Sequence, residues 1–259
     1  WAGARGMPIA WQAHHGAEVL GALPLLATRR SVAGLPVRRL ESLAIPDTQC
    51  WDWLAAPGQA EHAAEALARA LVERRAEWDE LELRHLTRLS LNWALLQAQL
   101  EQHGVPCEIT EATRNPRIDL TAGFEPWFAA RGKSLRKAAA LNRNRLARAG
   151  EVSIERVQGS GWQVALAEAT RISAASWKRH TGNSLDQPGP QASFAALTEW
   201  AAGSGHLSLW LLRVDSRAVA FEYQLRGEGR VYALRSDFDE TLGEASPGSQ
   251  LNLRLLETL

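Results

Sequence analysis

The sequence has 259 residues and contains only two cysteines, Cys50 and Cys107, too few and too far apart for a disulfide framework or a zinc site. Its seven histidines form no H-E-x-x-H pattern and no cluster with cysteine, and no G-x-S-x-G occurs. The longest apolar run, residues 19–27, is interrupted by Gly21 and Pro24 and is far shorter than the roughly 18 residues that span a bilayer. We therefore expect no metal site, no serine nucleophile, no transmembrane segment and, by default, a reducing cytoplasmic location.

The two ends of the sequence carry little that identifies a start or a stop. Residues 1–7 lack the charged segment, apolar segment and cleavage site of a signal peptide. The chain opens on Trp1 and stops at Leu259 inside a helical pattern, which indicates a piece of a longer polypeptide. Functional residues are consequently expected outside both ends.

Charge is balanced overall but not along the chain. The 29 Lys and Arg residues equal the 29 Asp and Glu residues, which argues against a general DNA-binding protein. Residues 126–150 nevertheless carry seven basic and no acidic side chains, while the segments on either side are mildly acidic. The neutral total conceals one local basic segment.

The first half of the chain reads as strands followed by helices. Apolar, β-branched stretches separated by turn residues predict an antiparallel meander of three strands at residues 7–12, 17–28 and 35–44. Pro57-Gly58 opens an Ala- and Leu-rich helix that ends near Arg75. The remaining expected elements are strands at 78–83, 105–112 and 116–120 and a helix at 91–103 with Ser90 as its N-cap.

The second half begins with helices and ends in a hairpin. The expected helices lie at residues 125–131, 134–149 (stopped by Gly150), 162–180 and 193–202, the strands at 152–157, 207–214, 218–225 and 231–236, and a last helix begins near Ser249. Residues 17–71 and 217–259 share one order: strand, turn, strand, loop, Pro-Gly and helix. Duplication is one interpretation and chance recurrence is the other.

These patterns predict a mixed α+β protein (an α/β class fold) with two lobes, each a mostly antiparallel twisted sheet flanked by helices. We expect the first lobe at residues 1–122, a basic helical connector at 123–150 and the second lobe at 151–259. The start of the last helix, at Ser246-Pro247-Gly248, offers free backbone N–H groups and the positive end of the helix dipole, which suit a phosphate. Ordinary helix capping is the alternative interpretation.

The hairpin of residues 217–236, the corner Ser236-Asp237-Phe238-Asp239 and the helix start at Ser246-Pro247-Gly248 together resemble the CelD-type, cellulose-biosynthesis-associated branch of the GNAT acyltransferase superfamily, which is related to the Fem peptidyltransferases. The basic helix around Arg136 and Arg143 and the segment Ser176-Trp177-Lys178-Arg179 are similar to the same family. Residues 126–259 carry most of this resemblance. Residues 1–125 resemble the degenerate first lobe of a tandem GNAT protein.

The resemblance implies an acyl-CoA donor, bound as a co-substrate rather than as a tightly held cofactor, along the strand at 231–236 with its pyrophosphate at the last helix start. The implied donor contacts are Leu234, Arg235, Ser236, Ser246, Gly248, Ser249 and Gln250. One departure stands out, because the Gln/Arg-x-x-Gly-x-Gly/Ala phosphate loop typical of GNAT proteins is missing. Fem-type relatives use aminoacyl-tRNA, so that donor stays open.

Acyl transfer to an amine needs a base for the nitrogen proton and donors for the tetrahedral oxyanion. Glu222, between Phe221 and Tyr223, and Asp237, at a strand end, are the candidate catalytic carboxylates, since aromatic surroundings raise a carboxyl pKa. Alternatively, Glu222 faces solvent and Asp237 caps a turn. A backbone N–H of the fourth strand is the expected oxyanion donor.

The acceptor is expected to carry an amine or a hydroxyl group, and an anionic acceptor is one of the alternatives. Its candidate contacts are Arg136, Lys137, Arg143, Trp177, Tyr223 and Tyr232. The basic helix has two interpretations. In the first it is an anion site, for a phosphorylated or lipid-linked precursor or for tRNA. In the second it is a solvated face paired with acids. The predicted function is an acyl-CoA-dependent acyltransferase acting on an exopolysaccharide or cell-envelope precursor; the alternatives are a Fem-like aminoacyl-tRNA-dependent peptidyltransferase and an inactive GNAT-like scaffold.

Overall fold

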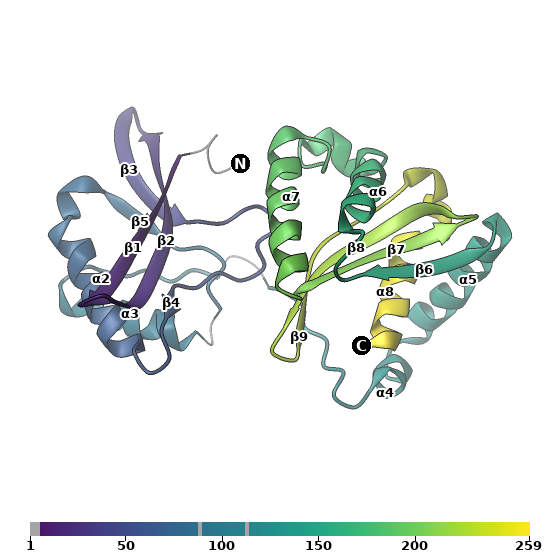
Figure 1. Ribbon diagram of the computed structural model, residues 1–259, viewed down its shortest axis with the longest axis horizontal. Helices are drawn as coiled ribbons and strands as arrows, with labels where there is room; N and C mark the ends of the chain where they lie inside the picture. Colours follow the sequence, from purple (N-terminus) through teal and green to yellow (C-terminus); the bar gives the residue numbers. More distant parts are fainter. Residues whose placement is uncertain (1–5, 88–89, 112–113) are drawn as a thin grey trace. The chain divides into compact units, whose positions relative to one another are not determined.

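The structure, a computed structural model, describes residues 6–87, 90–111 and 114–259. The chain divides into two compact units, residues 1–115 and 116–259, and each is described by itself (Figure 1). Both combine an antiparallel-rich sheet with helices, as the sequence predicts.

The first unit is built on the predicted meander. Strands β1 (Met7–His15), β2 (Glu18–Val32) and β3 (Leu35–Ser42) are antiparallel, β4 (Leu54–Ala55) pairs with β2, and β5 (Glu80–Glu82) joins β3 in parallel. The helices are α2 (Ala60–Glu73), the 3-10 turn η1 (Arg75–Glu77) and α3 (Leu91–Gln102). Ser90 caps α3 as predicted, because its hydroxyl accepts a 2.9 Å hydrogen bond from the backbone N–H of Trp93.

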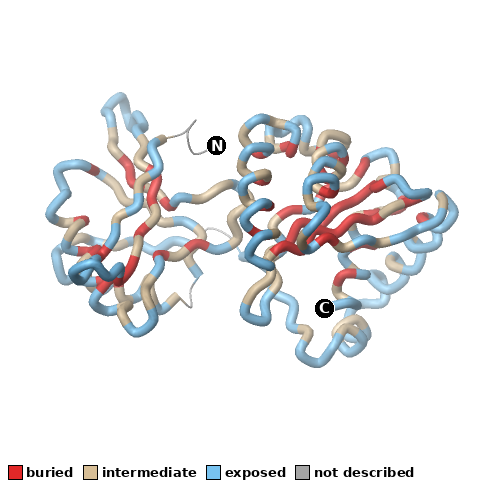
Figure 2. The backbone as a smooth tube through the Cα atoms, viewed as in Figure 1, coloured by how far each residue is buried: buried red, intermediate tan, exposed pale blue. Residues whose placement is uncertain are grey.

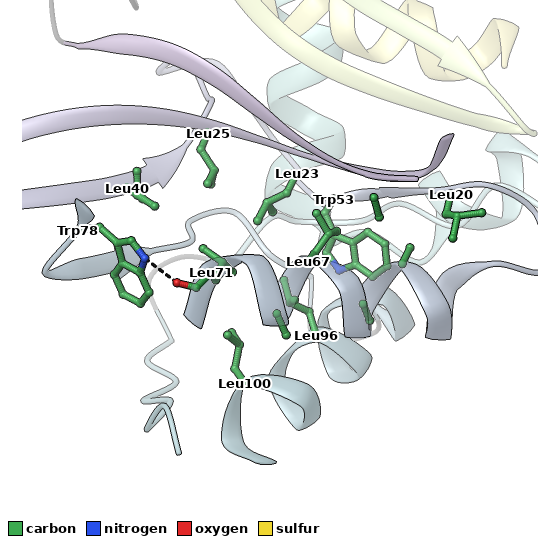
Figure 3. Packing of buried hydrophobic residues seen from close by; sticks show 14 of the residues in the cluster. Leu20, Leu23, Leu25, Leu40, Trp53, Leu67, Leu71, Trp78, Leu96 and Leu100 are labelled. Carbon is green, nitrogen blue, oxygen red and sulfur yellow. Dashed lines mark hydrogen bonds between the residues drawn. The ribbon is translucent and has the colours of Figure 1, made fainter. Parts of the chain in front are cut away.

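The core of the first unit lies between this sheet and α2. The apolar stripe of α2, including Leu67 and Leu71, packs against Leu23 of β2 and the fully buried Trp53, which precedes β4 (Figure 3). The indole N–H of Trp78 donates to the carbonyl oxygen of Leu71 over 3.0 Å. This bond gives the buried indole its polar partner and ties the segment after α2 to the helix.

Two strands predicted for the first half are wrong. Among the described residues, 105–111 and 116–120 form no strand, and Ala112 lies outside the described residues. Most of these residues are exposed and find no neighbouring strand, so their short apolar alternation has no sheet to join.

The second unit has a four-stranded antiparallel sheet in the order β6-β7-β8-β9. Its strands are β6 (Val152–Val157), β7 (Leu207–Val214), β8 (Arg217–Gly227) and β9 (Arg230–Phe238). Its helical elements are α4 (Phe124–Ala129), α5 (Lys133–Ala149), α6 (Trp162–Ala174), η2 (Trp177–Thr181), α7 (Pro188–Gly203), η3 (Glu240–Ala245) and α8 (Pro247–Thr258). Helices α6 and α7 cover one face of the sheet, and α8, with α5 beside it, covers the other (Figure 1). The central strands β7 and β8 are the most buried part (Figure 2).

Three expectations for the second unit differ from the structure. The single helix expected at 162–180 is broken, because α6 ends at Ala174 and Ser176 caps a separate 3-10 turn by accepting from the N–H of Lys178. Helix α7 begins at Pro188, a favourable first-turn residue, five residues before the expected start. The basic segment, expected to be a connector, packs within the second unit.

Helix α5 is held there by two hydrogen bonds. Arg145 donates to the carbonyl oxygen of Glu244 over 2.7 Å, and the side chain of Gln250 donates to the carbonyl oxygen of Ala139 over 2.9 Å. Gly150 ends the helix as predicted. Among the described helices of both units, none is long and apolar enough to cross a membrane.

Candidate functional site

The two candidate carboxylates lie on opposite faces of the second sheet. Glu222 of β8 is paired with Trp210 of β7, which belongs to the core beneath α8. Asp237 of β9 is paired with Phe221, one residue before Glu222, and successive side chains of a strand point to opposite faces. Glu222 and Asp237 therefore have separate roles.

Glu222 is buried, so the interpretation that it faces solvent is wrong. Its exposed fraction is 5%, although it is the cross-strand neighbour of the exposed Ser236 on the edge strand β9. Burial raises the pKa of Glu222 to about 7, while hydrogen bonds with Gln224 and Ser236 and the charge of Lys178 limit the rise. A carboxylate with a pKa near neutrality suits a general base.

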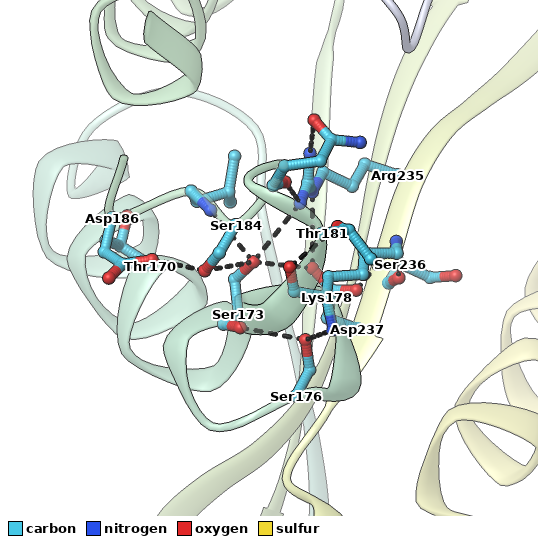
Figure 4. Close-up of polar contacts among 12 residues, drawn as sticks. Thr170, Ser173, Ser176, Lys178, Thr181, Ser184, Asp186, Arg235, Ser236 and Asp237 are labelled. Carbon is cyan, nitrogen blue, oxygen red and sulfur yellow. Dashed lines mark hydrogen bonds and ion pairs between the residues drawn. The ribbon is translucent and has the colours of Figure 1, made fainter. Parts of the chain in front are cut away.

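Asp237 is held inside a buried polar network on the other face (Figure 4). One carboxylate oxygen, Oδ2, accepts from the hydroxyl of Ser173 over 2.8 Å and lies 3.3 Å from Nε of Arg235. The other, Oδ1, lies 2.7 Å from Nζ of Lys178. The side chains of Asp237 and Arg235 are fully buried. The carboxylate of Asp237 is thus engaged by two cations and a serine hydroxyl, not by the backbone of a turn.

Ser173 is the centre of this network. Besides donating to Asp237, its hydroxyl accepts from the backbone N–H of Leu185 over 3.0 Å and from Arg235 over 3.3 Å. Arg235 also donates to the backbone carbonyl of Asn183. The network thus fixes the loop after η2 against β9.

Two predicted ligand contacts are core residues instead. Arg235 donates hydrogen bonds within the network just described and lies over the ring of Phe194, so its side chain does not contact the acyl donor. Tyr223 has no exposed surface, packs edge-on against Phe194 with 5.1 Å between ring centroids, and accepts from the hydroxyl of Thr198 over 3.2 Å. Burial raises the pKa of Tyr223 to about 12. Both residues support β9 and β8 from the α7 side.

The remaining predicted residues of β9 and η2 are more accessible. Ser236 is exposed, Leu234 and Tyr232 are half-buried, and the side chain of Trp177 is 54% exposed. Strand β9 is the edge of the described sheet, so ligands can approach it. These four residues stay candidates for contact with donor or acceptor.

The start of α8 has the geometry of an anion site. Ser246 adopts a left-handed conformation with φ of 49° and its side chain forms no capping hydrogen bond. Gly248 packs closely on Phe238, where an added Cβ would lie 3.4 Å from a ring carbon, and Ser249 is exposed. The first-turn N–H groups thus keep capacity for an anion. Gln250 is different, because its amide is used to bind α5.

The basic helix α5 is exposed and its cations are not paired with acids. Arg136, Lys137 and Arg143 are exposed, and in the described parts of the chain no salt bridge links a cation of α5 to a carboxylate. Within the second unit, these cations therefore form a solvated face without acidic partners. Leu146 is the buried residue of this helix and belongs to the core under α8.

A groove of about 760 Å³ lies between α5, α8 and the strands β6 and β7. Its floor includes Ile154, Trp210 and Leu212, and Arg143 and Arg254 contribute cations to its walls. Within the described residues, no three His, Cys, Asp or Glu side chains are placed to hold a metal ion.

Comparison with known proteins identifies the class of the second unit. Residues 133–259 match the family model for an acetyltransferase (GNAT) domain, so this part of the chain carries a GNAT-like acetyltransferase domain. No curated protein matches the chain.

Two solved structures resemble the whole chain in fold. FemX superposes with a TM-score of 0.54 and 11% identity, over 98% of this chain and 77% of FemX. The C-terminal DUF2156 domain of a candidate lysylphosphatidylglycerol synthetase from Agrobacterium fabrum superposes with a TM-score of 0.52 and 14% identity, over 98% of this chain and 66% of that chain. At these identities the likeness shows a shared fold. It does not identify the CelD-type branch.

Sequence reasoning missed Lys178 and Ser173 as parts of the site. Ser173 carries no signal, since a serine in a helix pattern is ordinary. Lys178 carries one, because it is one of only three lysines in a chain with 26 arginines.

Proposed function

We propose that the second unit transfers an acyl group from acyl-CoA to an amine or hydroxyl, with Glu222 as the general base. The observation that carries this proposal is the match of residues 133–259 to a GNAT acetyltransferase domain, a class that uses acyl-CoA as co-substrate. Glu222 adds a buried carboxylate with a pKa of about 7 beside the edge strand. The free first turn of α8, at Gly248 and Ser249, supports a pyrophosphate site.

The proposed acceptor is anionic, and the exposed cations of α5 support this class. Arg143 reaches the groove beside α8, while Arg136 and Lys137 lie along the exposed helix. An exopolysaccharide or cell-envelope precursor would satisfy this charge requirement. The support for those particular acceptors is the sequence resemblance alone.

Isothermal titration with acetyl-CoA and longer acyl-CoAs tests the donor. We expect saturable binding that weakens in a Gly248→Val variant, because the bulk beside Phe238 disturbs the helix start. Binding by none of the acyl-CoAs would overturn the CoA assignment. Binding without any release of CoA thiol in the presence of amines would instead favour an inactive scaffold.

Aminoacyl-tRNA is the second candidate donor, and the unpaired cations of α5 favour it. It predicts tRNA binding whose affinity falls steeply with salt concentration, with a smaller salt slope after Arg136→Gln and Lys137→Gln. A matched control is Arg69→Gln in the first unit, an exposed arginine paired with Glu65. No tRNA binding at low salt would exclude this donor.

A further inference from the structure

Lys178 lies at the edge of the second sheet, fixed by partners from β9. Its Nζ atom is 2.7 Å from Oδ1 of Asp237 and donates to the backbone carbonyl oxygen of Ser236 over 2.8 Å (Figure 4). Asp237 is in turn held by Arg235 and Ser173, both buried. The ammonium is therefore placed by a network whose members cannot move independently.

This ammonium keeps donor capacity for a ligand. A lysine ammonium has three N–H donors. Lys178 uses one of them in its hydrogen bond to the carbonyl oxygen of Ser236, and it forms an ion pair with Asp237. Among the residues that the structure describes, this ammonium has no further hydrogen-bond acceptor. The Lys178 side chain is 19% exposed, and its nitrogen lies 5.9 Å from the ring centroid of the exposed Trp177. A free N–H is thus accessible from solvent on the Trp177 side.

Lys178 is also linked to the candidate base, Glu222, through Ser236. Ser236, whose carbonyl oxygen it binds, is the cross-strand partner of Glu222, and the charge of Lys178 acts on that carboxylate. Glu222, buried on the α8 face of the sheet, and Lys178, at the edge of β9, are thus both neighbours of Ser236. Acyl transfer requires a base and an oxyanion donor, because negative charge builds on the carbonyl oxygen while a proton leaves the nucleophile.

We propose that Lys178 is a catalytic residue that binds the carbonyl oxygen of the acyl donor as this oxygen becomes negatively charged, and that Asp237 is its positioning residue. The assignment rests on the proposed acyl-transfer function. It replaces the expected backbone N–H with a side-chain cation as the main oxyanion donor.

The proposed step is balanced as follows. The neutral amine nitrogen forms a bond to the thioester carbon, and the carbonyl electron pair moves to oxygen, where Lys178 stabilises it. Glu222 takes the proton that the nitrogen loses. The oxyanion then reforms the carbonyl, the carbon–sulfur bond breaks, and the thiolate is protonated by Glu222. The products are an amide and free CoA thiol, with no oxidant or metal required.

The test compares Lys178→Met, Lys178→Arg and Arg179→Met in the whole chain. Release of CoA thiol from acetyl-CoA is followed with glucosamine 6-phosphate, an anionic amine, and with glucosamine, and acetyl-CoA binding is measured by calorimetry. We expect Lys178→Met to lower kcat about 100-fold with the Kd for acetyl-CoA within twofold, and Lys178→Arg to restore part of the rate. Arg179→Met is the matched control, because Arg179 is the next cation and pairs only weakly with Glu240, at 3.5 Å; it should keep the wild-type rate.

Other outcomes overturn the assignment. A kcat of Lys178→Met within twofold of wild type, or a change confined to KM, would show that Lys178 does not act in the transition state. Absence of turnover in the wild type would overturn the proposed function and the catalytic assignment together. An active wild type with an unaffected Lys178→Met would overturn only the assignment.

Unfolding of Lys178→Met is distinguished by a second measurement. The pKa of Glu222, followed by carboxyl-carbon NMR in Lys178→Arg and Arg179→Met, should stay near the wild-type value in both, whereas Lys178→Gln should raise it. An unmoved Glu222 pKa in a folded Lys178→Gln variant would show that this charge does not reach the site.

Discussion

The side-chain amide of Gln250 donates to the backbone carbonyl oxygen of Ala139 over 2.9 Å, joining the first turn of α8 to the middle of α5. Gln250 is buried, and α5 has only one other buried anchor, Leu146. The bond therefore does much to hold a helix that is otherwise exposed. It also removes Gln250 from the set of residues that can contact a donor.

Loss of this bond should loosen α5 rather than unfold the unit. Gln250→Ala is expected to lower the free energy of unfolding by about 1 kcal/mol and to increase amide hydrogen exchange across residues 136–146. Asn252→Ala, an exposed position on the same helix, should change neither. Equal exchange rates in the two variants would contradict the anchoring role.

The buried carboxyl of Glu222 makes a pH-dependent contribution to stability. Its pKa is raised from 4.5 to about 7, so between these values the folded chain keeps a proton that the unfolded chain has released. Stability from this group is therefore greatest below about pH 4.5, falls as the pH rises towards 7, and stays reduced above it.

Glu222→Gln should remove this dependence. We expect the variant to gain stability over wild type as the pH rises from 5 to 8, by on the order of 3 kcal/mol at most, while losing acyl transfer. Urea unfolding at both pH values measures the difference, with the exposed Glu199→Gln as control. Parallel pH–stability curves for wild type and Glu222→Gln would refute the raised pKa.

The fold was largely predictable because its elements have strong local signals. The Pro-Gly helix start before α2, the Ser90 cap, the Gly150 stop and the last hairpin each combine pattern with turn chemistry. The predicted strand at 105–112 failed, since an exposed stretch can alternate without any partner to pair with.

The site was less predictable, because burial decides the roles of its residues. Glu222 and Asp237 look alike in sequence, yet one is a protonatable buried acid and the other is held by two cations. The partners of Asp237 come from Ser173, Lys178 and Arg235, up to 64 residues away in the chain. Sequence spacing contains no information on such long-range contacts.

Removing a paired cation of the second unit should destabilise the protein more than removing an unpaired one. Arg213 bonds Glu155 at 2.7 Å and Glu168 at 2.6 Å and is 20% exposed, whereas Arg143 pairs with no described acid. Arg213→Gln is expected to cost about 2 kcal/mol and Arg143→Gln less than about 0.5 kcal/mol. Chemical denaturation of both variants measures this. A comparable loss for Arg143→Gln would mean that α5 has ionic partners in solution.

Gly150 allows the chain to pass from α5 into β6 beside Asp215. Its φ is 154°, and an added Cβ would collide with the carboxylate of Asp215, whose Oδ1 accepts from the N–H of Glu151 over 2.8 Å. Gly150→Ala must therefore displace this carboxylate and strain the backbone, at a cost of about 2 kcal/mol or more. Gly159→Ala is the control, because nothing lies within 4 Å of its added Cβ and its φ is not positive. Melting temperatures compare the two; if Gly150→Ala melts with Gly159→Ala, the Asp215 bond is not what fixes the junction between α5 and β6.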